Sequence, residues 1–160
     1  MITGGRTVSY TTKICLIGTA KVVRRDGRMV VLPRKAAALL AYLALQGRAA
    51  RSALAELLWP AALEPAARAN LRDLLCRLHD KVGERCVIGG NGDSLRLDPS
   101  TWVDVLHDPD GVDGHLLLAA YAYDDCRALD AWLRSEREGL RAAQTNRLLE
   151  ELGRCFGAVG

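Results

Sequence analysis

No stretch of the sequence approaches the ~18 uninterrupted apolar residues that a membrane-spanning helix requires. The amino terminus also lacks the apolar core of a signal peptide after its first charge. These two absences predict a cytoplasmic protein, and we expect no membrane among its partners.

Paired cysteines are missing as well. The five cysteines are odd in number, scattered, and never spaced as C-x-x-C: Cys15, Cys76, Cys86, Cys126 and Cys155. This usage is typical of reduced, mostly buried thiols rather than of a disulfide framework or a zinc site. His107 and His115 lie near several aspartates but without the regular spacing of metal ligands, so we predict no metal site.

The common catalytic signatures are absent too. The chain has no P-loop, no G-x-G-x-x-G and no G-x-S-x-G, and no histidine stands with a cysteine or serine in a recognisable local motif. Catalytic triads that assemble from distant positions leave no such local motif in a sequence. On this basis we expect neither an enzyme nor a bound cofactor.

What the chain does have is a charge asymmetry. Of its 160 residues, 49% are hydrophobic and 26% charged, which suits a globular protein. Residues 1–97 hold 16 Lys and Arg against 7 Asp and Glu, whereas residues 98–160 hold 6 against 12. A surface for a polyanion such as DNA therefore belongs in the first half.

We predict two domains, 1–98 and 99–160, because Pro99 breaks the preceding strand where the charge changes sign.

The first half begins with strand signals. After a polar lead-in over residues 1–12, the run 14–18 resembles a strand, and runs 21–24 and 29–32 flank a turn that contains Asp26-Gly27. Asp-Gly between two β-rich runs is a strong hairpin signal. These features predict a small antiparallel sheet.

Three helices and a second hairpin should follow. Pro33 opens an apolar stripe that ends at Gly47, a shorter helix runs over 51–59, and Pro65 opens a leucine-rich helix that continues to Val82. Two apolar runs, 86–88 and 95–97, then bracket a glycine-rich tip at 89–94. The whole is an α+β layout, that of a winged helix-turn-helix with a small N-terminal antiparallel sheet and a C-terminal β-hairpin wing.

The second half should be mainly helical. We expect a loop over 102–114, a short buried helix over 116–123, and one long helix over 126–156. A helix of that length needs a partner surface for its apolar stripe. Residues 99–160 therefore read as a partner-binding domain.

Several segments carry a family resemblance. They are LPRKA at 32–36, LAELLWP at 54–60, ARANLR at 67–72, CRL at 76–78, LRLDP at 95–99, WVD at 102–104, DAWL at 130–133 and EREGL at 136–140. In these segments the chain resembles the bacterial transcriptional activators of the antibiotic-regulatory type, which join an OmpR-like winged helix to a bacterial transcriptional activator domain. The resemblance covers nearly the whole chain from residue 14.

The resemblance implies a DNA-binding activator. In such proteins the third helix, here 65–82, enters the major groove, and the hairpin, here 86–97, reaches the minor groove. The loop between the second and third helices touches RNA polymerase, which assigns that role weakly to Ala61, Ala62 and Leu63. The resemblance also implies direct-repeat sites in double-stranded DNA and a side-by-side homodimer.

This chain departs from the family pattern in three places. The second domain is abbreviated, since only residues 105–125 separate the WVD segment from the long helix. Where relatives carry a basic run, this chain has Cys76-Arg77-Leu78-His79-Asp80. Ala50 stands where a Ser or Thr often caps the second helix, which costs about 1 kcal/mol unless Ser52 replaces the cap.

Helical geometry selects the candidate base-reading residues. At 100° per residue, one face of the helix holds the core residues Leu71, Leu75, Leu78 and Val82. This geometry predicts Arg68 and Arg72 on one flank of that face and Asn70 and Arg77 on the other. Arginine can bind guanine, and asparagine adenine, with two hydrogen bonds. The major-groove candidates are Arg68, Asn70, Arg72 and Arg77, with Arg77 first because it occupies the family's retained arginine position.

Phosphate or wing contacts have a second set of candidates. They lie at helix ends or beside the wing: Arg34, Lys35, Arg51, Lys81, Arg85 and Arg96. The alternative for the arginines of the 65–82 helix is a solvated face paired with Asp73 or Asp80, and the alternative for Arg96 is simple projection to solvent. Cys76, His79 and Asp80 also keep a second function open, namely a protein-interaction module whose winged helix no longer binds DNA.

Overall fold

The computed structural model describes residues 9–83, 85–89 and 92–157. Its first strand, β1 (Thr12–Cys15), buries Thr12 and Ile14 and exposes Lys13, as the alternation of side chains across a strand requires. β1 pairs antiparallel with β2 (Lys21–Val23), which pairs antiparallel with β3 (Met29–Val31). Gly27 has φ +87° in the turn between β2 and β3, so the predicted Asp-Gly hairpin is confirmed.

A fourth strand makes this sheet mixed rather than antiparallel. β7 (Thr101–Val103) lies parallel to β1, with Thr12 opposite Thr101, and the strand order is β3-β2-β1-β7. The predicted antiparallel pairing is confirmed for β1, β2 and β3, but the prediction of an antiparallel sheet missed the parallel strand β7. A parallel pair needs a long crossover instead of a tight turn, so no local signal marks it in the sequence.

The predicted helices of the first half are present. α1 (Arg34–Gln46) follows Pro33 and ends at Gly47, which has φ +86°. α2 (Arg51–Leu58) and α3 (Glu64–Val82) pack against each other, and Gly83 ends α3 in the left-handed conformation. No side chain caps α2 at Ala50. All four apolar residues expected on one stripe of α1 are buried: Ala36, Leu39, Leu40 and Leu43.

The second hairpin belongs to a separate sheet. β5 (Val87–Gly89) and β6 (Ser94–Leu97) pair antiparallel as predicted, and β4 (Arg48–Ala50) adds a strand on the other side of β6. β4 is only a few residues long between two helices, too short for a periodic pattern to reveal it. Two residues of the predicted glycine-rich tip, 90 and 91, lie outside the described residues.

Residues beyond 98 differ from expectation. The predicted loop over 102–114 contains most of β7, the helix α4 (Asp104–His107) and the start of a 3₁₀ turn, η1 (Gly114–Leu116). The predicted helix over 116–123 is wrong, because Leu118 has φ +51° and residues 117–123 are not helical. Leu117 instead bridges to Ile17, and both Leu117 and Leu118 are buried.

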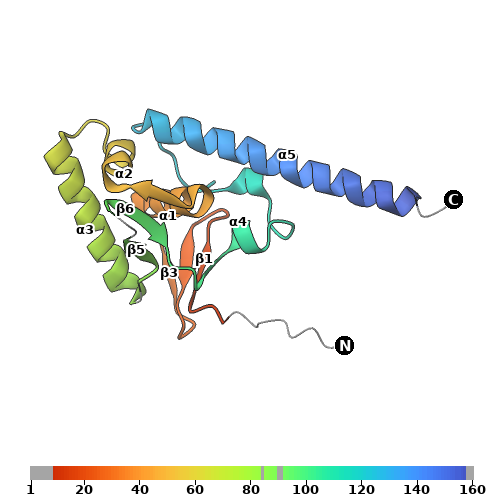
Figure 1. The fold of residues 1–160 in the computed structure, drawn as a ribbon, viewed down its shortest axis with the longest axis horizontal. Helices are drawn as coiled ribbons and strands as arrows, with labels where there is room; N and C mark the ends of the chain where they lie inside the picture. The colour runs from red at the N-terminus through yellow and green to blue at the C-terminus, as the bar shows by residue number, and fades with distance from the viewer. Residues whose placement is uncertain (1–8, 84, 90–91, 158–160) are drawn as a thin grey trace.

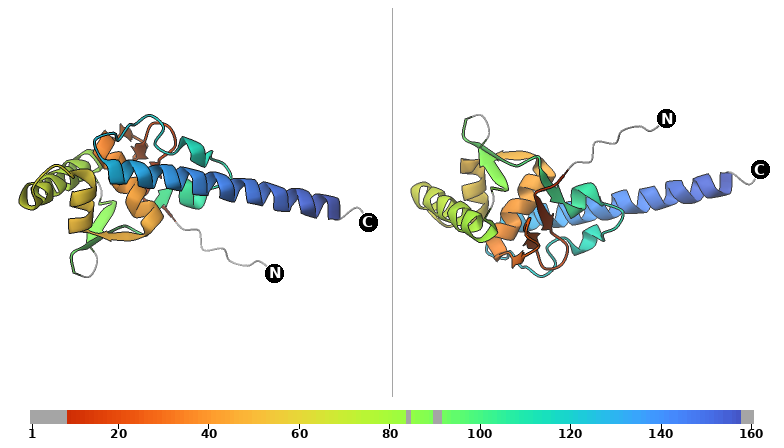
Figure 2. Two further views of the ribbon diagram at one scale, coloured as in Figure 1. Left: turned by 90° about the horizontal axis from the view of Figure 1, so that it is seen from above. Right: turned by 90° about the horizontal axis from the view of Figure 1, so that it is seen from below.

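α5 (Arg127–Gly157) is the predicted long helix. Its first turns bury Leu129 and Leu133 in the same apolar cluster that contains Leu39 and Leu40 of α1. Figure 1 shows α5 running past α2 and α1 and then extending beyond the rest of the molecule, and both views in Figure 2 agree. The extended end carries exposed apolar side chains, Leu148, Leu149, Leu152 and Phe156. Among the described residues, no helix is both long enough and apolar enough to cross a membrane.

The expected domain boundary at 98/99 falls between β6 and β7, which belong to different sheets. Asp104, at the start of α4, connects the two sides of that boundary. Its carboxylate accepts hydrogen bonds from the backbone N–H groups of Leu16, at 2.9 Å, and Val105, at 2.8 Å. Burial raises the pKa of the Asp104 carboxyl above its ordinary value, with these backbone hydrogen bonds opposing the rise.

Candidate nucleic-acid interface

One side of α3 is held in the core and the rest faces out. Ala67, Leu71, Leu78 and Val82 are buried, while Leu74 and Leu75 are half-buried against the same cluster. This spacing rotates the charged side chains of α3 to the two flanks of the buried stripe. The geometry predicted for the flanks is confirmed, with Arg68 and Arg72 on one side and Asn70 and Arg77 on the other.

The first flank of α3 faces the β5–β6 hairpin. A groove of about 510 Å³ separates them and is lined by Arg72 and His79 of α3, Arg51 of α2 and Arg85 before β5. Arg72 and Arg85 are exposed, and Arg51 is half-buried. Three of the predicted cations from three parts of the chain therefore meet in one groove.

Asp93 stands where this groove continues toward the start of α3. Its carboxylate lies 3.7 Å from Nε of Arg51 and 3.8 Å from Nη2 of Arg68. Arg68 also lies 3.5 Å from Glu64 one helical turn earlier. Asp93 thus brings together two cations that the sequence places 17 residues apart.

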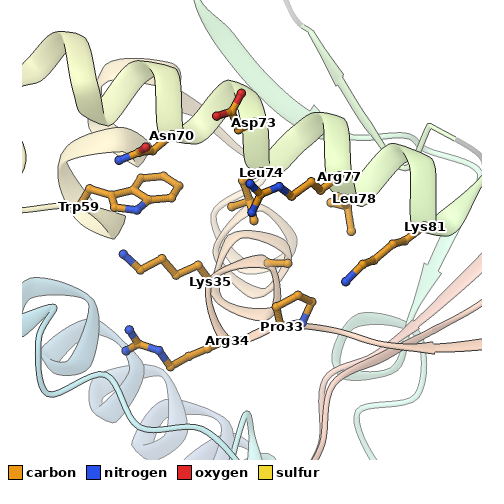
Figure 3. Close-up of a pocket in the computed structure, with 11 residues that line it drawn as sticks. Pro33, Arg34, Lys35, Trp59, Asn70, Asp73, Leu74, Arg77, Leu78 and Lys81 are labelled. Atoms are coloured by element: carbon orange, nitrogen blue, oxygen red, sulfur yellow. The ribbon is translucent and has the colours of Figure 1, made fainter.

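The second flank of α3 faces the beginning of α1. A groove of about 430 Å³ lies between them, with Leu74, Leu78, Pro33 and Trp59 among its lining residues. Figure 3 shows Arg77 and Lys81 extending from α3 into this groove, opposite Lys35. Asn70 lines the same groove beside Trp59, and Asp73 adds a carboxylate.

The two predicted cations of α1 already have intramolecular partners. Arg34 donates to both oxygens of Asp125, at 2.5 and 2.8 Å, and to the carbonyl of Ala122 at 3.0 Å. The hydrogen bond from Arg34 holds the pKa of the Asp125 carboxyl well below its usual range. Nζ of Lys35 lies 4.7 Å from the ring centroid of Trp59, a cation–π distance.

The remaining predicted sites are exposed or partly so. Arg96 is exposed on β6, where it stands opposite Arg48 of β4 in the strand register. In the loop between α2 and α3, Ala61 and Leu63 are exposed, whereas Ala62 is half-buried and donates to the carbonyl of Trp59. Trp59 is half-buried and packs against the core.

The outermost ridge of α3, between its flanks, is less basic than the flanks. Asp73, Cys76 and Asp80 are all exposed there. Over its full length α3 contains the four cations Arg68, Arg72, Arg77 and Lys81 and the three carboxylates Glu64, Asp73 and Asp80. The positive charge of this surface therefore depends on Arg51 and Arg85, which other segments contribute.

Sequence reasoning missed three residues of this surface. Asp93 and Asp125 pair with predicted cations across long sequence separations, so no periodic pattern could indicate them. Arg48 was missed because β4 was not predicted.

Comparisons with known proteins add no relative. No model of a known protein family matches the sequence, and no curated protein matches it either.

Proposed function

We propose that this protein is a sequence-specific regulator of transcription that binds double-stranded DNA as a winged helix. In this proposal α3 lies in the major groove and the β5–β6 hairpin approaches the neighbouring minor groove. The observation that carries it is the groove between α3 and the hairpin, where Arg51, Arg72 and Arg85 meet. The acidic second half does not supply a carboxylate to the lining of this groove among the described residues.

The dimensions and chemistry of α3 suit this role. The major groove of B-DNA admits one α-helix, and α3 presents side chains on both flanks of its buried stripe along 19 residues. Of the two arginines on the hairpin side, Arg72 is the stronger candidate for base contact, because it has no ion pair among the described residues. Arg68 pairs with Glu64 and Asp93. Arg51 and Arg85 would bind phosphates and set the register of α3 on the duplex.

The resemblance noted in the sequence extends the proposal to partners. It makes the protein an activator of the antibiotic-regulatory type that binds direct repeats as a side-by-side homodimer. RNA polymerase would contact the loop at Ala61, Ala62 and Leu63, of which Leu63 is 82% exposed. No catalytic activity and no cofactor form part of this proposal.

Selection from a pool of random duplex DNA tests the proposal. We expect the wild-type protein to enrich one sequence motif, and its affinity to fall linearly on a log–log plot against salt concentration. Arg72→Ala should weaken binding to the enriched site by about 1–3 kcal/mol if it reads a base. Arg134→Ala removes an exposed arginine of α5 that pairs with Asp130, and it serves as the control that should bind normally.

A second candidate function is favoured by the ridge of α3. Asp73, Cys76 and Asp80 occupy the most exposed line of the helix, and two of them would face the phosphates of a duplex with like charge. A protein-interaction module would need no basic ridge. Two results together would favour this second function and contradict the first: a selection that enriches no motif, and an affinity for duplex DNA that is the same in wild type and Arg72→Ala.

A further inference from the structure

Asp93 is the one carboxylate among the described residues that line the two adjoining grooves between α3 and the β5–β6 hairpin. The smaller groove, of about 200 Å³, is formed by Arg51, Arg68, Arg72, Leu71 and Asp93. The side chain of Asp93 is about half exposed. Any anion that enters this groove therefore meets a fixed negative charge among three arginines.

The backbone, not the ion pairs, holds Asp93 in position. The carbonyl of Asp93 accepts a hydrogen bond of 2.8 Å from the N–H of Arg51, and the next residue, Ser94, stands opposite Ala50 in the β4–β6 register. The start of α2 is thereby joined to the start of β6 without help from the carboxylate. Neutralising the side chain should leave this main-chain connection intact.

Another anion can readily replace the Asp93 carboxylate in its ion pairs with Arg51 and Arg68. Their distances, 3.7 and 3.8 Å, are long for charge-assisted hydrogen bonds, and all three side chains are 42–52% exposed. Exposed ion pairs of this kind contribute little to the free energy of folding. A phosphate could replace the carboxylate beside Arg51 and Arg68, while the carboxylate, fixed by its backbone, would remain close enough to repel it.

We propose that Asp93 lowers the affinity of this surface for polyanions by competing with phosphate for Arg51 and Arg68. The inference rests on the proposed DNA-binding function and adds a regulating residue to it. The effect does not depend on base sequence, because phosphates carry no sequence information. Asp93 therefore weakens non-specific binding to DNA. Discrimination between DNA sequences then depends more on base contacts, such as the one proposed for Arg72.

Asp93→Asn tests this inference. We expect the variant to bind non-specific duplex DNA about fivefold more tightly at low salt, the effect of removing one repulsive charge near 4 Å in a water-like environment. The slope of log affinity against log salt should steepen by about 0.9, as expected when one more phosphate is neutralised. The matched control is Asp110→Asn, which changes the net charge equally but removes an exposed carboxylate paired with Arg147 of α5.

The outcomes separate the two proposals. If the wild type binds DNA and Asp93→Asn binds equally or more weakly, Asp93 orients its arginines instead of competing for them, and the inference is wrong. An equal gain in affinity for Asp110→Asn would also overturn it, since net charge alone would then explain the effect. If neither protein binds duplex DNA at any salt concentration, the DNA-binding function itself fails, and this inference fails with it.

Discussion

Arg34 binds Asp125 through both ends of its guanidinium group, with Nη1 2.5 Å from Oδ1 and Nη2 2.8 Å from Oδ2. Tyr123 strengthens the connection, because its hydroxyl donates to the carbonyl of Arg34 at 2.6 Å and its ring lies under the guanidinium. The basic first half and the acidic second half are thus joined at the start of α1 and the start of α5. A cation expected to bind phosphate thus has a carboxylate partner within the molecule.

Asp125→Asn should loosen the start of α5. The variant loses the charge of the bidentate pair, so we expect amide hydrogen exchange over residues 126–133 to become faster, by up to about fivefold for an exposed pair. Hydrogen-exchange mass spectrometry would measure this. Asp124→Asn, at the exposed residue just before, is the control, and equal exchange in the two variants would contradict the prediction.

The same pair has a defined pH dependence. Because Arg34 holds the pKa of Asp125 below its ordinary value, the stabilisation is complete above about pH 3.9 and is lost as the pH falls toward the folded-state pKa. Wild type and Asp125→Asn should therefore differ in urea unfolding at neutral pH and converge in acid.

Asp104 should show the opposite pH dependence. Burial raises its pKa, so the folded state holds the proton more tightly, and the contribution of Asp104 to stability falls as the pH rises from about 3.9 through the raised value. The side chain introduced by Asp104→Asn does not titrate. The free energy of unfolding of this variant, measured in urea at each pH, should therefore lack this decline. Parallel pH profiles for wild type and variant would count against the assignment.

Removing the Asp104 side chain has a separate consequence. Asp104→Ala leaves the backbone N–H groups of Leu16 and Val105 without their acceptor. A buried donor without a partner costs about 1–3 kcal/mol, so the free energy of unfolding should fall by that amount. Urea denaturation at neutral pH measures it.

Two glycines, Gly114 beside α5 and Gly139 within it, should respond to substitution by alanine with opposite changes in stability. A Cβ at Gly114 would overlap the side chain of Leu140, so Gly114→Ala should destabilise the protein by about 1–3 kcal/mol. A Cβ at Gly139, within α5, meets nothing within 4 Å. Gly139→Ala should therefore stabilise by up to about 1 kcal/mol, through helix propensity. Unfolding free energies that shift in the same direction would show that η1 does not pack against α5 in this way.

The helices could be predicted from sequence because their signals are local. Pro33 and Gly47 mark the limits of α1, and Gly83 marks the end of α3, each through its own backbone restrictions. The leucine spacing of α3 was sufficient to assign Arg72 and Arg77 to different flanks. The candidate cations were found in this way, but not the groups that pair with them.

The pattern of residues along the chain therefore specifies α1, α2, α3, α5 and the two hairpins, together with the flank of α3 on which each cation lies, since these depend on neighbours a few residues apart. Tertiary contacts decide the parallel pairing of β7 with β1, the irregular course of residues 117–123, and the placement of Asp93 and Asp125 beside arginines. Those features join residues 25 to 100 positions apart. Their free energy depends on which surfaces remain uncovered after the local elements have formed, and no short stretch of sequence contains that information.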